Sequence, residues 1–532
     1  MSRELSMLDR LILSVAPTWG MNRVRARMIT DVLLSYDGAK TGRRTDGWIT
    51  TGADANAEIG PDLTRLRERS RDLCRNNSIA ARCLSVLTSS TIGTGIIPQA
   101  ATGDPELNKA IDDAFWRWSD DRECDADGDL DFFGVQRLAM RTIIESGAVL
   151  LRFRHRRPTD GFFVPLRLQT MEPDFIDMSA TTNNSGGDTI QGIELNALGE
   201  RVGFYLFAKH PGAVGSIRNF RAAWQSKFVP ASEIVHGYRK DRPGQLHGVP
   251  WLAPAMLLLR DMDEYNEAEI VRAKMAACLS LFVTGAEGPG ASVLGTETSE
   301  FGTGKRLEKM RPGMILYGRP GEDARPIVPT GHANFAEYMK FLLHIVAVAL
   351  DLHYTQASGD LTAVNYSSYR AGDRDFRGAI EAFRWLYFIP MVCTPVWRRF
   401  IDTAYAAGRI PVAAYGVNWH PPQFASVDPV KDALSDEREM SNGTLTWPDA
   451  VARKGNDPAK QLDVIAEWQK KADQAGVTFA FDQRDGGSQA APPAIDEPAK
   501  QLTALATERT GARDRYWTII ELDRRGRQCP RC

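Results

Sequence analysis

The chain has 532 residues, of which 43% are hydrophobic and 25% are charged, and its formal net charge at pH 7 is −2. A chain of this length can form several domains around a large buried core. The near-neutral charge argues against a static, high-affinity nucleic-acid binder, because such binding rests on neutralising phosphates with lysine and arginine. It is compatible with a surface past which DNA slides.

The N-terminal part is predicted to be an arm followed by helices. Residues 1–56 are turn-rich and basic in places, which indicates a peripheral arm with one short helix. Between Asp62 and Thr91 apolar residues recur every three or four positions, which predicts a helix that ends at Gly93–Gly95. Two more helices are predicted at Ala110–Trp118 and Phe132–Glu145, with an acidic stretch between them.

A β-rich region follows these helices. Alternating or β-branched residues predict strands at Ala148–Arg154, Leu166–Met171, Thr189–Leu195, Arg201–Ala208 and Ile234–Tyr238. The third and fourth strands flank a turn and are predicted to form a hairpin. A long, highly charged helix is then expected at Trp251–Met275.

The C-terminal half is predicted to be mostly helical. Two strand-like segments, Leu279–Thr284 and Met314–Tyr317, enclose a stretch rich in Gly, Ser and Thr at 285–304. Helices at Ala333–Leu350 and Ser367–Phe388 flank a polar loop, His353–Asn365.

Two prolines, Pro390 and Pro395, are expected to separate the second of these helices from Trp397–Ala407. Another helical region is predicted at Pro429–Ala475, and Gly486–Pro498 is typical of a linker to a mobile tail.

No cofactor, metal or membrane segment is predicted. The acidic loop Asp125–Asp131 fails the EF-hand pattern, because Leu130 and Gln136 stand where glycine and glutamate are required. Gly302–Lys305 lacks the serine or threonine that follows the lysine of a P-loop. The longest apolar run is about half the length that spans a bilayer.

The seven cysteines also predict no disulfide framework, and we interpret them as reduced intracellular thiols; they stand at positions 74, 83, 124, 278, 393, 529 and 532. The last two form a single CxxC, whereas a zinc site needs four ligands. The chain is therefore not expected to be an enzyme, although paired catalytic carboxylates are not recognisable from sequence alone.

The polar loop and the helix after it hold the candidate functional residues. Their neutral hydrogen-bonding side chains are His353, Tyr354, Thr355, Gln356, Ser358, Thr362, Asn365 and Tyr366. Arg370, Arg374 and Arg377 follow on one helix face. Such groups can contact phosphates without reading base sequence. The alternative is an ordinary surface loop whose arginines pair with nearby carboxylates, namely Asp373, Asp375 and Glu381.

Four motifs in this order resemble the lambda-type portal family of tailed phages. They are Arg71–Arg82 with Gly93–Ile96, Gly192–Arg201 with Tyr205, Met310–Glu322, and the most specific one, DLTAVNYSS at Asp360–Ser368 with Arg370 behind it. The resemblance covers roughly Leu63–Ala475. It implies an α+β portal fold with a mixed α/β wing, a two-helix stem, a small clip and a helical crown, assembled as a ring of about twelve subunits.

Carried onto this chain, the resemblance implies the following division. The parts would be an N-terminal arm at 1–60, the wing at 61–250 and 367–425, stem helices at 251–276 and 333–351, the clip at 277–332, the DNA-channel tunnel loop at 352–366, the crown at 426–480, and a linker with a mobile tail at 481–532. The basic tail and its CxxC match no motif of the family.

The resemblance also implies a function. The chain would be a portal protein, or head–tail connector, whose ring forms the channel at one capsid vertex for DNA translocation in packaging, retention and ejection of the genome. Its partners would be further copies of itself, double-stranded DNA bound without sequence specificity, terminase, head-completion or adaptor proteins, and the major capsid protein or scaffold. It would reside in the virion and, during assembly, in the host cytoplasm. The alternatives are a metal-dependent nuclease or another structural virion protein.

Overall fold

The computed structural model describes residues 43, 46–48, 50–183, 185–213, 225–277, 282–284, 316–318, 334–362, 365–424, 429–454 and 458–477. The predicted Gly-rich stretch 285–304, the tail and most of the arm lie outside the described residues. The chain divides into two compact units, Met1–Asp457 and Pro458–Cys532. The described part of the second unit contains the helix α15 (Pro458–Ala475), which is part of the predicted helical region.

The first long helical pattern forms two helices, α3 (Ala55–Asn76) and α4 (Ser78–Ile92), and not the single predicted one. Asn77 interrupts it with an extended backbone, and its side-chain oxygen accepts a hydrogen bond from the Ala80 amide. An asparagine can satisfy a helix start in this way, so it competes with continuation of the preceding helix. Gly93 ends α4 with a positive φ of 54°, which confirms the predicted stop.

Two helices and a three-stranded sheet build the main core. The helices are α5 (Pro105–Asp120) and α6 (Phe132–Ser146). The antiparallel sheet has the order β3-β2-β8, formed by Leu166–Met171, Ala148–His155 and Ile234–Tyr238. Aromatic rings of Phe115, Trp118 and Phe400 pack in this core with centroids 5.2–5.8 Å apart. The predicted helices and strands here are confirmed.

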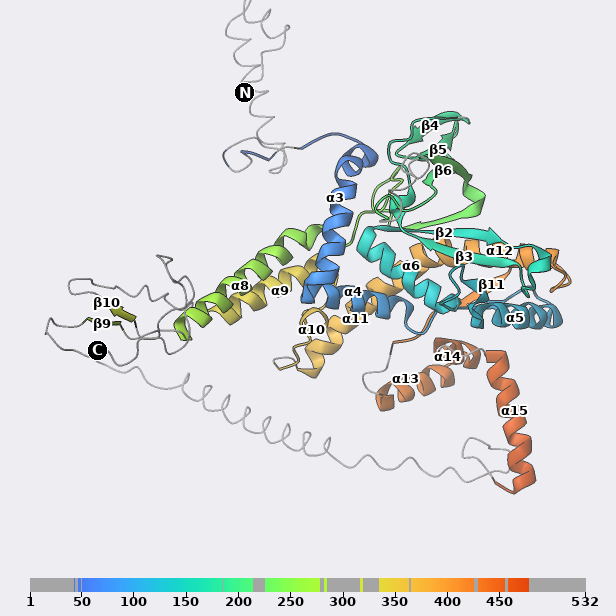
Figure 1. Cartoon of the computed structure of the whole chain (residues 1–532). Coiled ribbons are helices and arrows are strands. Elements are labelled where there is room, and N and C mark those ends of the chain that lie inside the picture. Colours follow the sequence, from blue (N-terminus) through green and yellow to red (C-terminus); the bar gives the residue numbers. More distant parts are fainter. Residues whose placement is uncertain are drawn as a thin grey trace, which may run out of the picture. The chain divides into compact units, whose positions relative to one another are not determined.

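A second, four-stranded antiparallel sheet has the order β4-β5-β6-β7 (Figure 1). Its strands are Gly186–Ile190, Ile193–Asn196, Arg201–Phe207 and Ser226–Pro230. The single strand predicted at Thr189–Leu195 is two strands, because Gln191 and Gly192 turn the chain with positive φ. The hairpin of β5 and β6 is confirmed, with Ile193 opposite Phe204.

Helices α8 (Met256–Ala277) and α9 (Phe335–Ala349) form a pair that extends away from the sheets (Figure 1). They contact each other through Tyr265, whose ring lies 5.3 Å from Phe335 and 5.7 Å from Tyr338. Beyond the pair, β9 (Phe282–Thr284) and β10 (Leu316–Gly318) run parallel. The predicted helices and short strands of this region are therefore present.

The predicted helix break at the two prolines is wrong. Helix α11 (Tyr366–Phe383) continues through a π-helical segment, η8 (Arg384–Cys393), into α12 (Thr394–Ala406). Pro390 lies inside the π-helical segment, where the hydrogen-bond pattern is already altered. Pro395 lies in the first turn of α12, a position that tolerates a missing amide proton.

The remaining described elements complete a mixed α+β architecture. A short sheet pairs β1 (Ile97–Ala100) with β11 (Val417–His420), two strands that were not predicted. Helices α13 (Pro429–Ser441) and α14 (Trp447–Arg453) follow. Among the described residues, no helix is both long and apolar enough to cross a bilayer.

Candidate nucleic-acid interface

The segment between α9 and α11 is more ordered than the predicted polar loop. It contains a short helix, α10 (Tyr354–Ser358), which begins after His353. The imidazole Nδ1 of His353 lies 2.8 Å from the Thr355 hydroxyl, and the Gln356 side chain accepts a hydrogen bond from the His353 amide at 3.2 Å. The Thr355 side chain is buried, so it is not available to a ligand.

Contacts with two other helices hold α10 in place. The ring of Tyr354 stacks on His344 of α9, with centroids 4.1 Å apart and planes 7° from parallel. Arg82 of α4 donates a hydrogen bond to the Gln356 carbonyl at 3.2 Å. These contacts make α10 a fixed connection between α9 and α4.

Solvent-exposed polar groups gather just after α10. Thr362 and Asn365 are exposed, whereas the Ser358 hydroxyl is bonded back to the Tyr354 carbonyl at 2.8 Å. Hydrogen bonds from the Thr362 hydroxyl and amide hold the pKa of Asp360 below its ordinary value. Asn365 uses its side-chain oxygen to cap α11, accepting from the Ser368 amide at 2.8 Å. The side chain of Tyr366 lies outside the described residues.

The three arginines of α11 have different partners. Arg370 pairs with Asp432 of α13 at 3.3 Å, and Arg377 pairs with Asp373 at 2.7 Å. Arg374 is exposed and has no ion-pair partner within the described part of the chain. Two of the three arginines are therefore neutralised: Arg377 by one of the carboxylates named in the alternative, and Arg370 by Asp432, which was not among them. Arg374 has an exposed side chain that could meet a phosphate.

Two residues that the sequence analysis did not single out determine the position of this segment. Gly372 of α11 faces His353 so closely that a Cβ atom there would lie 2.1 Å from the imidazole Cδ2. Arg384 is buried and donates to the carbonyls of Thr91 and Ser90, both at 2.6 Å. It also donates to the Pro422 carbonyl at 3.0 Å, and burial lowers its pKa to about 10. For Arg384, the feature of the sequence that could have indicated this buried role is an arginine within an apolar stretch.

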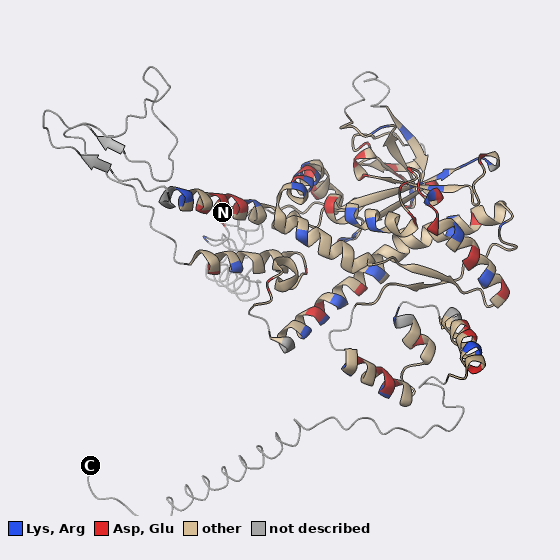
Figure 2. Cartoon of the chain, turned by 60° about the horizontal axis from the view of Figure 1, so that its bottom comes forward, with Lys and Arg blue, Asp and Glu red and all other residues tan. Residues whose placement is uncertain are grey.

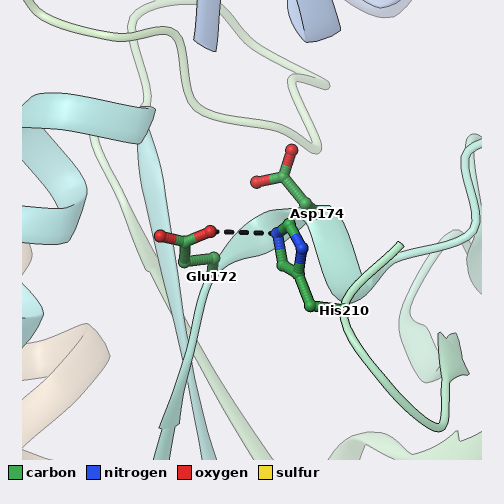
Figure 3. A group of neighbouring side chains, drawn as sticks. All are labelled: Glu172, Asp174 and His210. Carbon is green, nitrogen blue, oxygen red and sulfur yellow. Dashed lines mark ion pairs between the residues drawn. The ribbon is translucent and has the colours of Figure 1, made fainter. Parts of the chain in front are cut away.

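One side-chain cluster has the composition of a metal site: Glu172, Asp174 and His210 bring ligand atoms within 4.8 Å of one another (Figure 3). The guanidinium of Arg71 contacts both carboxylates, at 3.2 Å from Glu172 and in a short hydrogen bond with Asp174. His210 Nε2 lies 3.1 Å from Glu172. Burial favours a raised pKa for Asp174, but the hydrogen bond from Arg71 and nearby positive charges outweigh it, and the pKa lies below its ordinary value. The cluster is a protein ion-pair network.

A known protein family matches the part of the chain that contains most of these elements. The model of "Phage portal protein, lambda family" matches residues 41–384, which include α3 to α11. The chain belongs to the lambda family of phage portal proteins. The resemblance inferred from the four motifs is thereby confirmed.

Curated relatives agree with this assignment. The chain is 25% identical over 483 residues to a "Probable portal protein" of Halomonas phage phiHAP-1, a match that covers 85% of this chain and 89% of the relative. It is 21% identical over 524 residues to the "Portal protein" of Escherichia phage N15, covering 85% and 96%.

Solved structures with similar chains include the "Virion of native gene transfer agent (GTA) particle", with 15% identity and a TM-score of 0.39. Another is the "Neck of native GTA particle computed with C12 symmetry", with 14% identity and a TM-score of 0.40. Both matches cover 75% of this chain and 94% of the other.

Proposed function

We propose that about twelve copies of this chain form a ring around a DNA channel at one capsid vertex. The observation that supports it most is the family match, because its range, residues 41–384, includes the helix pair α8–α9 and the segment at α10. The ring would admit the genome during packaging, retain it and release it into the tail.

In this proposal the sheets and helices from α3 to β8, together with α11, α12 and β11, form the wing. Helices α8 and α9 form the stem, residues 277–332 the clip, and residues 426–480 the crown. The tunnel loop is the segment 352–366, in which α10 fixes the beginning and the exposed residues Thr362 and Asn365 face the channel.

The charge of the proposed channel segment is compatible with DNA that slides through the channel. Its exposed side chains are Leu361, Thr362 and Asn365, beside the partly exposed carboxylate of Asp360, and the one arginine of α11 without a described ion-pair partner is Arg374. One such arginine per copy would place about twelve positive charges around the channel, and Asp360 would place about as many negative ones, so the segment would carry no excess charge that holds DNA in place.

The proposed partners are terminase and the head-completion or adaptor proteins at the clip, and the major capsid protein or scaffold around the wing. The protein would be found in the virion and, during assembly, in the host cytoplasm. It would have no catalytic activity of its own. The nuclease alternative needs carboxylates available to a metal ion, whereas Glu172 and Asp174 are paired with Arg71.

A single pair of variants tests this function. In the first, residues 359–364 are deleted, which leaves Tyr354 and Thr355 in place to hold α10. In the second, the same residues are replaced by a Gly/Ser segment of equal length. Native mass spectrometry and top-view electron microscopy should show a closed ring in both cases. We expect the deletion to abolish DNA-filled particles and the replacement to reduce them.

A wild-type protein that stays monomeric under all assembly conditions would refute the ring. Normal DNA-filled particles from the deletion variant would instead refute the tunnel-loop assignment while the ring stands.

A further inference from the structure

The C-terminal end of strand β2 carries three arginines on one face of its sheet. Arg152, Arg154 and Arg156 stand two residues apart, and the Arg156 amide still donates to the Pro165 carbonyl at 2.9 Å, so the antiparallel pairing continues to the third arginine. Side chains of alternate strand residues point to the same face and lie about 7 Å apart. We call these three residues the β2 arginine row.

The row begins where its face of the sheet is no longer covered by the core. Leu151 and Phe153, on the opposite face, are buried in the main core. Leu150, which precedes the row on the same face, is buried in a second core cluster that includes residues of β5 and β6. The first two arginines of the row are half-buried and the third is exposed. The row therefore leads from the edge of this cluster into solvent.

Little negative charge neutralises the row. Within the described part of the chain, Arg152 has one ion pair, to Glu233 at 4.0 Å, whereas Arg154 and Arg156 have none. Arg154 donates instead to the Gln169 side chain at 2.8 Å, which orients a guanidinium that has five N–H donors. Burial lowers the pKa of Arg154, and the neighbouring arginines act in the same direction. Along most described helices, in contrast, basic and acidic residues are interspersed (Figure 2).

The surroundings of the row favour a polyanion over an apolar protein surface. Among the described residues, none of the large apolar side chains that stand exposed belongs to residues 148–171. Protein interfaces usually bury aromatic or aliphatic anchors at their centre. Contacts with phosphates need no such anchor, because a guanidinium can bind two phosphate oxygens through parallel N–H groups.

We propose that the β2 arginine row binds the phosphate backbone of double-stranded DNA, as a second contact beside the proposed channel segment 352–366. One strand of duplex DNA carries a phosphate about every 3.4 Å along the axis, so arginines about 7 Å apart can meet alternate phosphates. The channel segment carries no excess charge, whereas the row sets three arginines against one carboxylate. This inference rests on the proposed function in taking DNA as the ligand, and it adds a contact that holds DNA.

The salt dependence of DNA binding tests the row, because it counts phosphate contacts. Fluorescence anisotropy with a labelled duplex of about 12 base pairs measures the binding constant of the full-length protein between about 50 and 200 mM salt. Each phosphate contact contributes about 0.9 to the slope of log K against log salt concentration. The double substitution Arg154→Gln with Arg156→Gln should therefore reduce this slope by about 1.8 and weaken binding to unrelated sequences equally.

Two control variants separate the charge of the row from other effects. Arg75→Gln with Arg141→Gln changes the net charge by the same amount, but it removes arginines that already pair with carboxylates of their own helices. Its slope should equal that of the wild type. Arg154→Lys with Arg156→Lys keeps both positive charges and should retain most of the slope. Circular dichroism shows whether each variant is folded.

An unchanged slope in the folded Arg154→Gln, Arg156→Gln variant would overturn the inference, as would a wild type that does not bind the duplex at about 50 mM salt. Either result leaves the proposed ring standing, since native mass spectrometry measures ring closure separately. A monomeric wild type whose slope still falls in the variant would instead refute the ring and support the row.

A photo-crosslinking residue at Ser232 identifies the occupant in phage particles. This position is exposed and lies next to Glu233, which contacts the row. We expect crosslinks to DNA in filled particles. Crosslinks to a virion protein or to a second copy of the chain, without crosslinks to DNA, would mean that an acidic protein segment occupies the row and would contradict the proposal.

Discussion

Acidification should destabilise this protein through buried histidines, of which His247 can be worked through quantitatively. Its side chain is only 1% exposed and its Nε2 lies 3.0 Å from the Gln191 carbonyl, so the neutral ring donates to that oxygen. Burial lowers the pKa of His247 to about 3, and the nearby charge of Arg67 acts in the same direction. The pKa of the neighbouring buried His236 is also lowered, first by burial and then by Arg201.

The direction of this pH effect follows from the number of protons that the unfolded and the folded states bind. Below pH 6.5 the unfolded chain binds a proton at His247 that the folded protein does not bind. The free energy of unfolding therefore decreases as the pH falls below 6.5, and it goes on decreasing until the pH reaches the folded-state pKa of His247. For a pKa of 6.5 in the unfolded chain and about 3 in the folded protein, the free energy of unfolding drops by about 2 kcal/mol between pH 8 and pH 5. His236 adds a loss of the same sign.

The variant His247→Gln isolates this contribution. Its side-chain amide can keep the hydrogen bond to Gln191 but does not titrate. Urea unfolding followed by circular dichroism at pH 8 and pH 5 should show that the variant loses about 2 kcal/mol less than wild type over this interval. The exposed His155→Gln serves as the control and should change the pH dependence by less. Equal pH dependence in wild type and His247→Gln would refute the reasoning.

Two further predictions concern the position of α11. Replacing Arg384 by Met removes three hydrogen bonds from a buried cation to backbone carbonyls. In urea titrations this variant should lower the free energy of unfolding by about 3 kcal/mol, and Arg384→Lys should restore only part of that loss. A loss below about 1 kcal/mol for Arg384→Met would contradict this role. Gly372→Ala should cost about 1–3 kcal/mol and reduce DNA-filled particles, because its Cβ would collide with His353. The matched Gly378→Ala, with nothing within 4 Å of its Cβ, should be neutral or stabilising, and equal behaviour of the two variants would disprove the collision.

Local sequence patterns were enough to predict much of the secondary structure and the family. Periodic apolar residues identified helices α5, α6, α8 and α9, and β-favouring runs identified β2, β3, β6 and β8, because these signals depend on residues close together in the chain. The DLTAVNYSS motif indicated the portal family by its residues alone. Local spacing was less informative at Asn77 and Gln191, where one side chain or one turn divides an otherwise continuous pattern.

Long-range contacts determine the features that these local patterns did not predict. Strand β1 pairs with β11 although more than 300 residues separate them, and neither short segment carries a strong pattern of its own. The helix through Pro390 persists because Phe388, Ile389 and Val392 are buried in the core, and this packing offsets the altered hydrogen bonds. In the same way, Arg384 and His247 owe their roles to burial among residues distant in sequence, and burial is a property that spacing along the chain does not contain.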